Sequence, residues 1–341
     1  MKKIIEYIGN TLAFCYENYE NQPIEIKIIW FCIPLFICLI LLFLFAIITI
    51  KIRNYISNKL TNKYKPLMQK TIMECLATNG NDKINYCNKE LLNTNFKKKL
   101  FISILLELNS SLSGELKKKV QELYIQLSLF NYSFSKIKNT SWNIKIEGIR
   151  ELTQLEYKTN VDNAIIPYMN HSNEILRGEI QLAMVKLYGV NGLFYLNNLK
   201  YQLSEWQQIE IIDALKSHIN FKMPDLKIWY ESNNNSVVEI ALKITQKYQL
   251  INYCNSIIKL LHHDNYYIRM KSRFLIRHFK LIEATNRLCE MFKEPYELEE
   301  LQDIVDTLEQ LGVEYNYFDL DNNDLKNIYI LKEMQQLMLK I

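Results

Sequence analysis

The chain has 341 residues, with 41 basic and 37 acidic side chains and a net charge of +4. Only eight glycines and six prolines occur, which argues against a fold rich in strands and tight turns. Leu, Ile, Lys, Glu and Asn dominate, and apolar residues recur at the spacing of a helix. The composition therefore predicts an all-α chain.

An apolar run from Ile28 to Ile50 contains no charged residue, and only Pro34 and Thr49 fall outside the hydrophobic set. As a helix it would span about 34 Å, enough for a hydrocarbon core of about 30 Å. The alternative is a buried core helix, but a core helix of this length normally shows a polar stripe. The run is too long for a cleaved signal peptide and lacks a small-residue cleavage site after it. We expect a transmembrane helix over residues 28–50, which is also the predicted contact with the membrane.

The charges that flank this run predict its orientation. Six basic residues come after it before the first acid, Glu74, whereas three lysines before it are outnumbered by four glutamates. Positive flanks stay on the cytoplasmic side. We therefore expect a single-pass protein of the bacterial cytoplasmic (inner) membrane, with residues 1–27 as a short extracytoplasmic segment and the C-terminal part in the cytoplasm. The basic residues after the run are Lys51, Arg53, Lys59, Lys63, Lys65 and Lys70.

Residues 51–139 are predicted to form a helical connector next to the membrane. A helix is expected over 54–78, in which Pro66 either produces a kink or starts a new helix. Two more are expected over 83–109 and 113–130, after a break at residues 79–82. A small interfacial helix is predicted within residues 1–22.

The seven cysteines contain no C-x-x-C pair, which is typical of a reducing compartment and of thiols that serve as small core residues. Charge is unevenly spread along the chain. Residues 283–341 hold fourteen acidic and five basic residues, a net charge of −9, which leaves +13 for residues 1–282. Such a distribution suits a chain whose basic part lies near an anionic membrane surface and whose acidic end lies away from it. It equally suits solvated helix faces without a special role.

A pattern of about 31 residues repeats from residue 140 onward. Each block opens with Ser, Asn, Asp or Pro, which favour the start of a helix, and continues with an amphipathic helix, a short break and a second helix. A helical hairpin of this size cannot bury its apolar stripe alone, so neighbouring units must stack. We therefore predict an α-solenoid over residues 140–341, with an acidic C-terminal cap. The equivalent buried positions are Ile149, Ile180, Ile212, Ala241, Ser272 and Ile304. The second helices are expected at Val161–Met169, Val190–Tyr201, Phe221–Glu231, Ile251–Leu261 and Ile282–Lys293.

Two of these blocks resemble short HEAT-like repeats, whose pattern is D-x-x-x-V-R-x-x-A-x-x-L. The resemblance covers roughly residues 140–315, although the other blocks lack the arginine and the period is shorter than that of most HEAT repeats. It implies an α-α superhelix of the HEAT/armadillo type, in which Arg177 and Arg269 pair with acidic or carbonyl groups of an adjacent repeat. The whole plan resembles membrane-anchored HEAT-repeat proteins of Bacteroidetes-type bacteria, which are encoded near membrane glycosyltransferases. The matching residues are Asp264, Ile268, Arg269, Ser272 and Leu275 in one block, and Asn173, Leu176, Arg177, Ile180 and Ala183 in the other.

No residue pattern predicts a catalytic, cofactor-binding or metal site, and neither a cofactor nor a small-molecule substrate is expected. His262 and His263 point apart on a helix and are expected to favour its C-terminal end as cations. Asp319, Asp321 and Asn323 resemble the start of a calcium loop, but Asp324 and Ile330 replace its glycine and its glutamate.

Two surfaces are candidate contact sites. A basic stripe on one helix is expected to be solvated or to face a protein, with anionic lipid or nucleic acid as alternatives. Aromatic residues of the second helices are either anchors for a partner or part of the core. The stripe comprises Arg269, Lys271, Arg273, Arg277 and Lys280, and the aromatic residues are Tyr168, Phe194, Tyr195, Trp229, Tyr230 and Tyr253.

These features together predict a membrane-anchored scaffold or adaptor that presents a cytoplasmic solenoid to a protein partner. A regulatory subunit of a membrane glycosyltransferase system is one version of this function. The alternatives are an enzyme of lyase or glycosylase type built on HEAT-like repeats, and a solenoid that binds anionic surfaces or nucleic acid. We expect a protein partner, no nucleic acid and no enzymatic activity.

Overall fold

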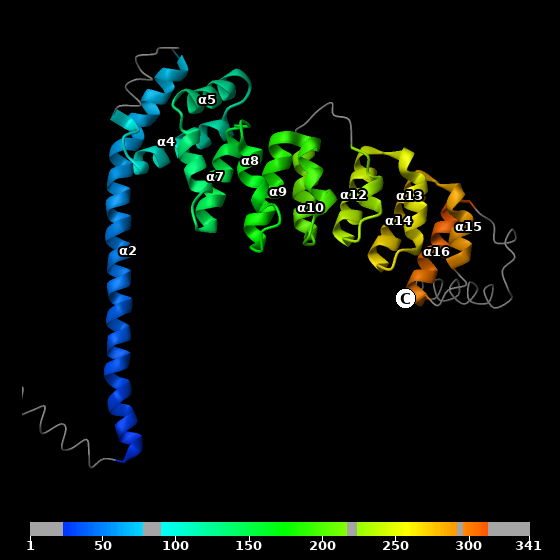
Figure 1. The fold of residues 1–341 in the computed structure, drawn as a ribbon, viewed down its shortest axis with the longest axis horizontal. Helices are drawn as coiled ribbons and strands as arrows, with labels where there is room; N and C mark the ends of the chain where they lie inside the picture. The colour runs from blue at the N-terminus through cyan, green and yellow to red at the C-terminus, as the bar shows by residue number, and fades with distance from the viewer. Residues whose placement is uncertain (1–22, 78–89, 217–223, 292–295, 313–341) are drawn as a thin grey trace, which may run out of the picture. The chain divides into compact units, whose positions relative to one another are not determined.

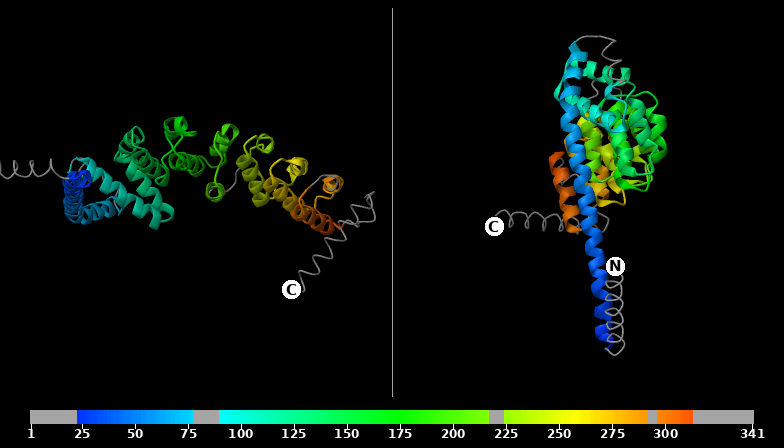
Figure 2. Two further views of the ribbon diagram at one scale, coloured as in Figure 1. Left: turned by 90° about the horizontal axis from the view of Figure 1, so that it is seen from below. Right: turned by 90° about the vertical axis from the view of Figure 1, so that its left-hand side faces the viewer.

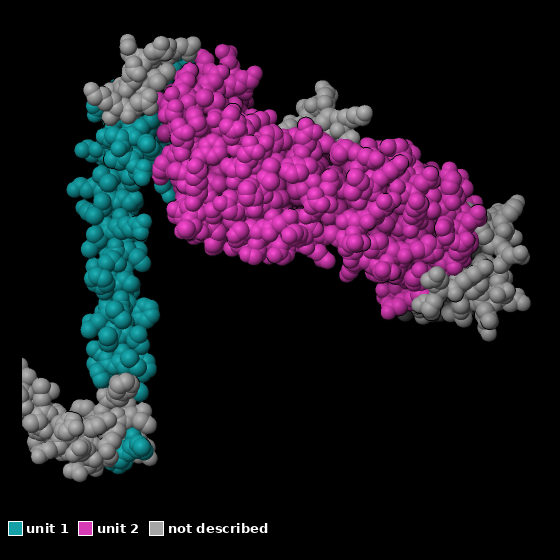
Figure 3. Space-filling model, viewed as in Figure 1, with its two compact units in different colours: residues 1–104 teal, residues 105–341 magenta. Residues whose placement is uncertain are grey.

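The computed structural model describes residues 23–77, 90–216, 224–291 and 296–312 (Figure 1). Every regular element in these ranges is helical, which confirms the prediction of an all-α chain. The chain divides into two compact units, residues 1–104 and 105–341 (Figure 3). The predicted interfacial helix, the break at residues 79–82 and the segment from Asp319 to Asp324 lie outside the described residues.

Unit 1 is dominated by α2 (Ile24–Ala77), one helix of 54 residues that continues through both Pro34 and Pro66. Pro66 therefore does not start a new helix. At 1.5 Å per residue α2 is about 81 Å long, more than twice the thickness of a hydrocarbon core. The helix is long and apolar enough to cross a membrane, and none of its most apolar stretch is buried inside the protein. The large apolar side chains from Ile33 to Ile50 are exposed.

The C-terminal end of α2 belongs to the core of unit 1. Met68 and Ile72 are fully buried, whereas most side chains from residue 51 to residue 60 are exposed. The ammonium of Lys97, on α4 (Asn95–Ser111), lies 4.6 Å from the centre of the Tyr64 ring of α2. An exposed helical segment of about ten residues thus separates the apolar stretch from the first packed side chains. The expected helix over 83–109 begins only at Asn95 in the described part of the chain.

Two short helices replace the single helix expected over residues 113–130. They are α5 (Gly114–Gln126) and α6 (Phe130–Ile137). The first helix ends in a turn at Ser128, which adopts a left-handed backbone conformation with φ of 51°. Leu127 and Leu129 are buried on either side of this turn, and their burial holds it in place. Sequence periodicity did not predict α6, which contributes two side chains to a buried polar cluster.

Six longer helices come next, one in each predicted block, and all six predicted buried positions are buried. Within unit 2, α7 contacts α9, α9 contacts α10, α12 contacts α14, and α14 contacts α16. The helices succeed one another in chain order, as the colours in Figure 2 show. Their bounds are α7 (Trp142–Gln154), α9 (Glu174–Tyr188), α10 (Glu205–Leu215), α12 (Asn235–Tyr248), α14 (Tyr266–Phe279) and α16 (Leu298–Gln310).

Capping side chains mark where several of these helices begin. Asn173, Ser204, Asn234 and Asn265 each accept hydrogen bonds from backbone N–H groups of the first turn. Such a cap satisfies N–H groups that have no partner within the helix. Ser204 and Gln207 form a complete capping box. The cap of α14 is Asn265, one residue after the Asp264 of the sequence motif.

The second elements lie within or close to their predicted ranges, and all but Lys227–Tyr230 are partly or wholly 3₁₀-helical in the described residues. The chain must return tightly over the preceding helix, and at Gly192 a Cβ atom would collide with the carbonyl oxygen of Met184. In the described residues, the blocks with 3₁₀ turns therefore lack a continuous second α-helix. The second elements are α8 (Val161–Ile165) with η2 (Ile166–Tyr168), η3 (Gly189–Asn198), α11 (Lys227–Tyr230), η4 (Ile251–Tyr253) with α13 (Cys254–Lys259) and η5 (Leu260–His262), and η6 (Ile282–Ala284) with α15 (Thr285–Met291).

Candidate functional site

The arginine stripe of α14 faces α16, not solvent or a partner. One edge of the Arg269 guanidinium group binds both oxygens of the Glu300 carboxylate, with Nε–Oε1 and Nη2–Oε2 distances of 2.7 and 2.6 Å. Arg273 is fully buried and binds Glu300 at 2.7 Å and Asp303 at 2.5 Å. Arg277 binds Asp303 at 2.6 Å. The expectation that these arginines are solvated or face another protein is therefore wrong, whereas the expected pairing of Arg269 with an acidic group of the next block is found.

The contact between α14 and α16 favours the ionised form of the Glu300 carboxyl group. Burial alone would raise the pKa of the Glu300 carboxyl, but its hydrogen bonds to Arg269 and Arg273 outweigh burial and hold the pKa below its usual value. A buried charge of this kind is stable only while its partners remain in place. The three arginines form ion pairs within the chain and therefore do not offer a basic surface for lipid or nucleic acid.

A common geometry in two blocks explains their shared arginine. Arg177 Nη1 donates to the carbonyl oxygens of His171 and Ser172, at 2.7 and 3.2 Å. Arg269 Nη1 donates to the carbonyl oxygens of His263 and Asp264, at 2.8 and 3.0 Å. Both arginines thus bind the loop that precedes their own helix. Each guanidinium also lies over a tyrosine ring of the next loop, at 4.2 Å for Tyr201 and 5.0 Å for Tyr296.

The histidines in these two loops act as hydrogen-bond acceptors. His171 Nδ1 accepts the N–H of Asn173, and His263 Nδ1 accepts the N–H of Asn265, both at 3.0 Å. A neutral imidazole is required for this bond. Burial and Arg269 lower the pKa of His263, against the opposing effect of Asp264. The expectation that His263 favours the helix end as a cation is wrong.

The aromatic residues of the second elements belong mostly to the core. Tyr195, Trp229, Tyr230 and Tyr253 are buried, and among the six only Phe194 is largely exposed. Trp229 donates its indole N–H to Asn197 at 2.7 Å. Of the two interpretations offered by the sequence, packing accounts for these four rings.

A buried polar cluster joins α5, α6 and α7, and sequence reasoning missed it. Tyr124 donates to Ser133 at 2.8 Å, and Ser133 donates to Glu151 at 2.7 Å. Lys136 binds the other oxygen of Glu151 at 2.5 Å. Burial raises the pKa of the Glu151 carboxyl, although Lys136 and Ser133 oppose this. A carboxyl with a raised pKa resembles a general acid, but both of its oxygens are occupied and the side chain is buried, so its role is structural.

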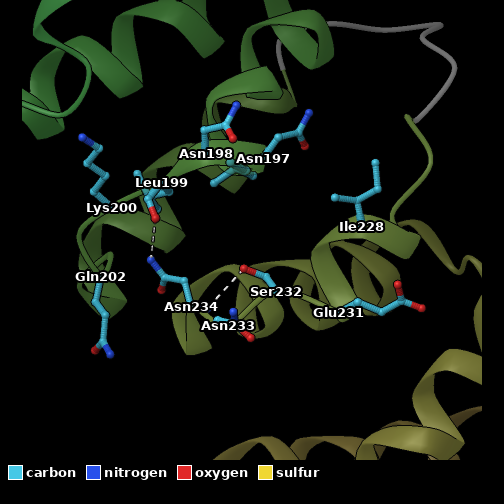
Figure 4. Close-up of a pocket in the computed structure, with 11 residues that line it drawn as sticks. Asn197, Asn198, Leu199, Lys200, Gln202, Ile228, Glu231, Ser232, Asn233 and Asn234 are labelled. Carbon is cyan, nitrogen blue, oxygen red and sulfur yellow. Dashed lines mark hydrogen bonds between the residues drawn. The ribbon is translucent and has the colours of Figure 1, made fainter.

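A polar cleft of about 550 Å³ lies where the loop before α10 meets the loop before α12 (Figure 4). Two asparagine pairs contribute to it, residues 197–198 and 233–234. Ile228, which is 60% exposed, and Glu231 border it on the side of α11. An excess of asparagine is the only signal of this cleft in the sequence. The remaining lining residues are Leu196, Leu199, Lys200, Gln202 and Ser232.

Among the residues that the structure describes, no three His, Cys, Asp or Glu side chains are grouped to hold a metal ion. The five described cysteines form no disulfide. Burial raises the pKa of the Cys289 thiol to about 11, which disfavours the thiolate that a nucleophile or a metal ligand requires.

No protein-family model matches the chain, and no curated protein is found to be similar to it.

Proposed function

We propose that the chain is a membrane-anchored scaffold, in which a HEAT-like α-solenoid on the cytoplasmic side of a bacterial inner membrane holds a protein partner. One observation carries the proposal: side-chain bonds between successive helices recur at the period of the sequence repeat. Arg150 binds Glu179, 29 residues later, and Gln208 binds Glu239, 31 residues later. Arg269 and Glu300 are also 31 residues apart. Contacts between residues about one sequence period apart are what a stack of repeats requires.

The polar side chains in the described part of the chain support a function in binding another protein. The buried charged groups at Glu151, Arg273 and Glu300 are held in pairs within the chain. The polar cleft combines several polar side chains, and among them Asn198, Lys200 and Asn233 are exposed. Exposed polar side chains of this kind suit the binding of a surface or a segment of another protein.

The anchor contributes by confining the partner. Lipid would cover the exposed apolar side chains of residues 33–50, and the basic residues from Lys51 to Lys70 favour a cytoplasmic position for the C-terminal part of the chain. The exposed helical segment after residue 50 then serves as a spacer. A partner held in this way experiences a raised local concentration near the membrane without any new contact.

The proposal is tested by crosslinking in intact cells that carry an affinity-tagged full chain, followed by detergent extraction and mass spectrometry. Tagged residues 1–77, which retain α2, serve as the control for proteins captured by the membrane helix alone. We expect a stoichiometric protein partner with the full chain and none with the control. Equal recovery with both, or no partner together with conversion of a small molecule by the purified chain, would overturn the proposal.

A further inference from the structure

The polar cleft contains side chains that the fold itself does not use. Asn198, Lys200, Gln202, Glu231 and Asn233 make no side-chain hydrogen bond or ion pair within the described part of the chain, and all five are exposed. They come from two loops that meet in unit 2. Polar groups that line a hollow without serving the fold are candidates for recognition of a ligand.

The other members of the asparagine pairs hold these loops in position. Asn197 accepts the indole N–H of Trp229 at 2.7 Å. Asn234 donates to the carbonyl oxygens of Leu199 and Tyr201, both at 3.2 Å, and its Oδ1 accepts the N–H of Ser236. In each pair, therefore, one amide fixes the two loops to each other and its neighbour remains available at the cleft. Such fixed loops reduce the ordering cost of binding.

The chemistry of the free groups indicates the kind of ligand. A side-chain amide offers both a donor and an acceptor, which matches the N–H and C=O of a peptide group. No aromatic residue lines the cleft, so it lacks the flat apolar face against which a sugar ring packs. Lys200 and Glu231 carry opposite charges, so the lining has no net preference for an anion or a cation.

We propose that this cleft binds an extended segment of a protein partner through its main chain, with the amides of Asn198, Gln202 and Asn233 pairing with peptide groups. Ile228 provides an apolar contact for one side chain of the segment, and Lys200 and Glu231 favour charged residues of opposite sign on it. The inference rests on the proposed function, because it names the part of the chain that holds the partner.

The test selects peptides from a phage-displayed library of random 12-residue sequences on the detergent-solubilised full chain, and compares their affinity for a variant with Asn198→Ala and Asn233→Ala. Neither side chain bonds within the described fold, so the variant should unfold at the same temperature as the unmodified protein. We expect selected peptides to bind the variant about tenfold or more weakly. The matched control carries Asn255→Ala and Asn286→Ala, two exposed asparagines outside the cleft, and should bind as the unmodified chain does.

Three results would overturn the inference: no peptide enriched, equal binding to the cleft variant, or selection of oligosaccharides instead of peptides from a parallel glycan array. The proposed function has a separate outcome. If the crosslinked partner is recovered equally with the cleft variant, the cleft inference fails and the scaffold stands. If peptides require the cleft but the full chain and the control of residues 1–77 recover the same proteins from cells, peptide binding at the cleft stands and the scaffold fails.

Discussion

Two helix contacts in unit 2 show different ways of joining neighbouring elements. Helices α6 and α7 meet at Gly148, where a Cβ atom would lie 2.5 Å from the carbonyl oxygen of Ser133. Helices α14 and α16 meet through Arg269, Arg273 and Arg277, which bind two carboxylates. The first contact depends on the absence of a side chain at Gly148, beside one buried ion pair between Lys136 and Glu151. The second depends on three arginines that share two carboxylates.

The difference shows that neighbouring helices of one repeating sequence pattern can be held together by different interactions. A close-packed contact responds to volume, because buried backbones cannot move apart without losing contact with their neighbours. An ionic contact responds to charge, because each buried ion must keep its partners. Each junction should therefore fail under a different perturbation.

Glu300→Gln should produce the largest effect, because it leaves the fully buried Arg273 with Asp303 as its remaining carboxylate. We expect a loss of about 3 kcal/mol in unfolding free energy and faster hydrogen exchange over residues 298–310. The control is Glu299→Gln, a neighbouring exposed acid, which should change neither quantity. Equal effects of the two substitutions would show that α16 is not held by the ion pairs.

Gly148→Ala tests the steric junction and should cost about 2 kcal/mol, because the new methyl group meets the backbone of α6. Gly178→Ala is the matched control, since its Cβ would meet the flexible end of the Gln207 side chain at 2.7 Å. We expect the control to differ from the unmodified protein by less than about 1 kcal/mol, because alanine also favours the helix. Thermal unfolding by circular dichroism measures both, and a control more harmful than Gly148→Ala would contradict the steric account.

Low pH should destabilise the contact between α14 and α16 more than the contact between α6 and α7. The folded pKa of Glu300 is lowered, so its contribution to stability is complete above the pKa of an unfolded glutamate, about 4.3, and is lost as pH falls below that value. Hydrogen exchange over residues 298–310 should therefore accelerate below pH 4.3, while residues 142–154 respond less. Uniform acceleration across both ranges would argue against this distinction.

The smallest effect concerns the turn before α14. The folded pKa of His263 is lowered below 6.5, so the unfolded chain takes up the proton first and stability decreases as pH falls below about 6.5. Asn139, which occupies the corresponding position before α7, accepts the N–H of Ser141 at 2.9 Å without titrating. We therefore expect His263→Asn to preserve the turn and reduce the decrease in melting temperature between pH 7.5 and 5.5. An unchanged pH dependence would show that His263 does not cause it.

The sequence predicted the features that depend on periodicity. The long apolar helix, the six longer helices and the buried positions such as Ile149 and Ser272 all reflect local pattern and are found where expected. The turn at Ser128 was missed because apolar residues continue through it. The 3₁₀-helical turns of the second elements were not predicted, because tight chain returns, as at Gly192, depend on tertiary contact.

The contacts of the charged side chains needed information beyond any single helix. Arg269 and Arg273 form a basic stripe on their own helix, and only Glu300, one repeat later, turns that stripe into a buried junction. A comparison of residues one period apart would have found this pair. The polar cleft could not be found in this way, because its lining depends on how two irregular loops meet.

Protease treatment of intact spheroplasts tests the central claim most directly, with the chain tagged at its C-terminus and detected by immunoblotting. The account predicts that residues 105–341 survive external protease and are digested only after the membrane is permeabilised. Digestion of these residues from outside intact spheroplasts would contradict it.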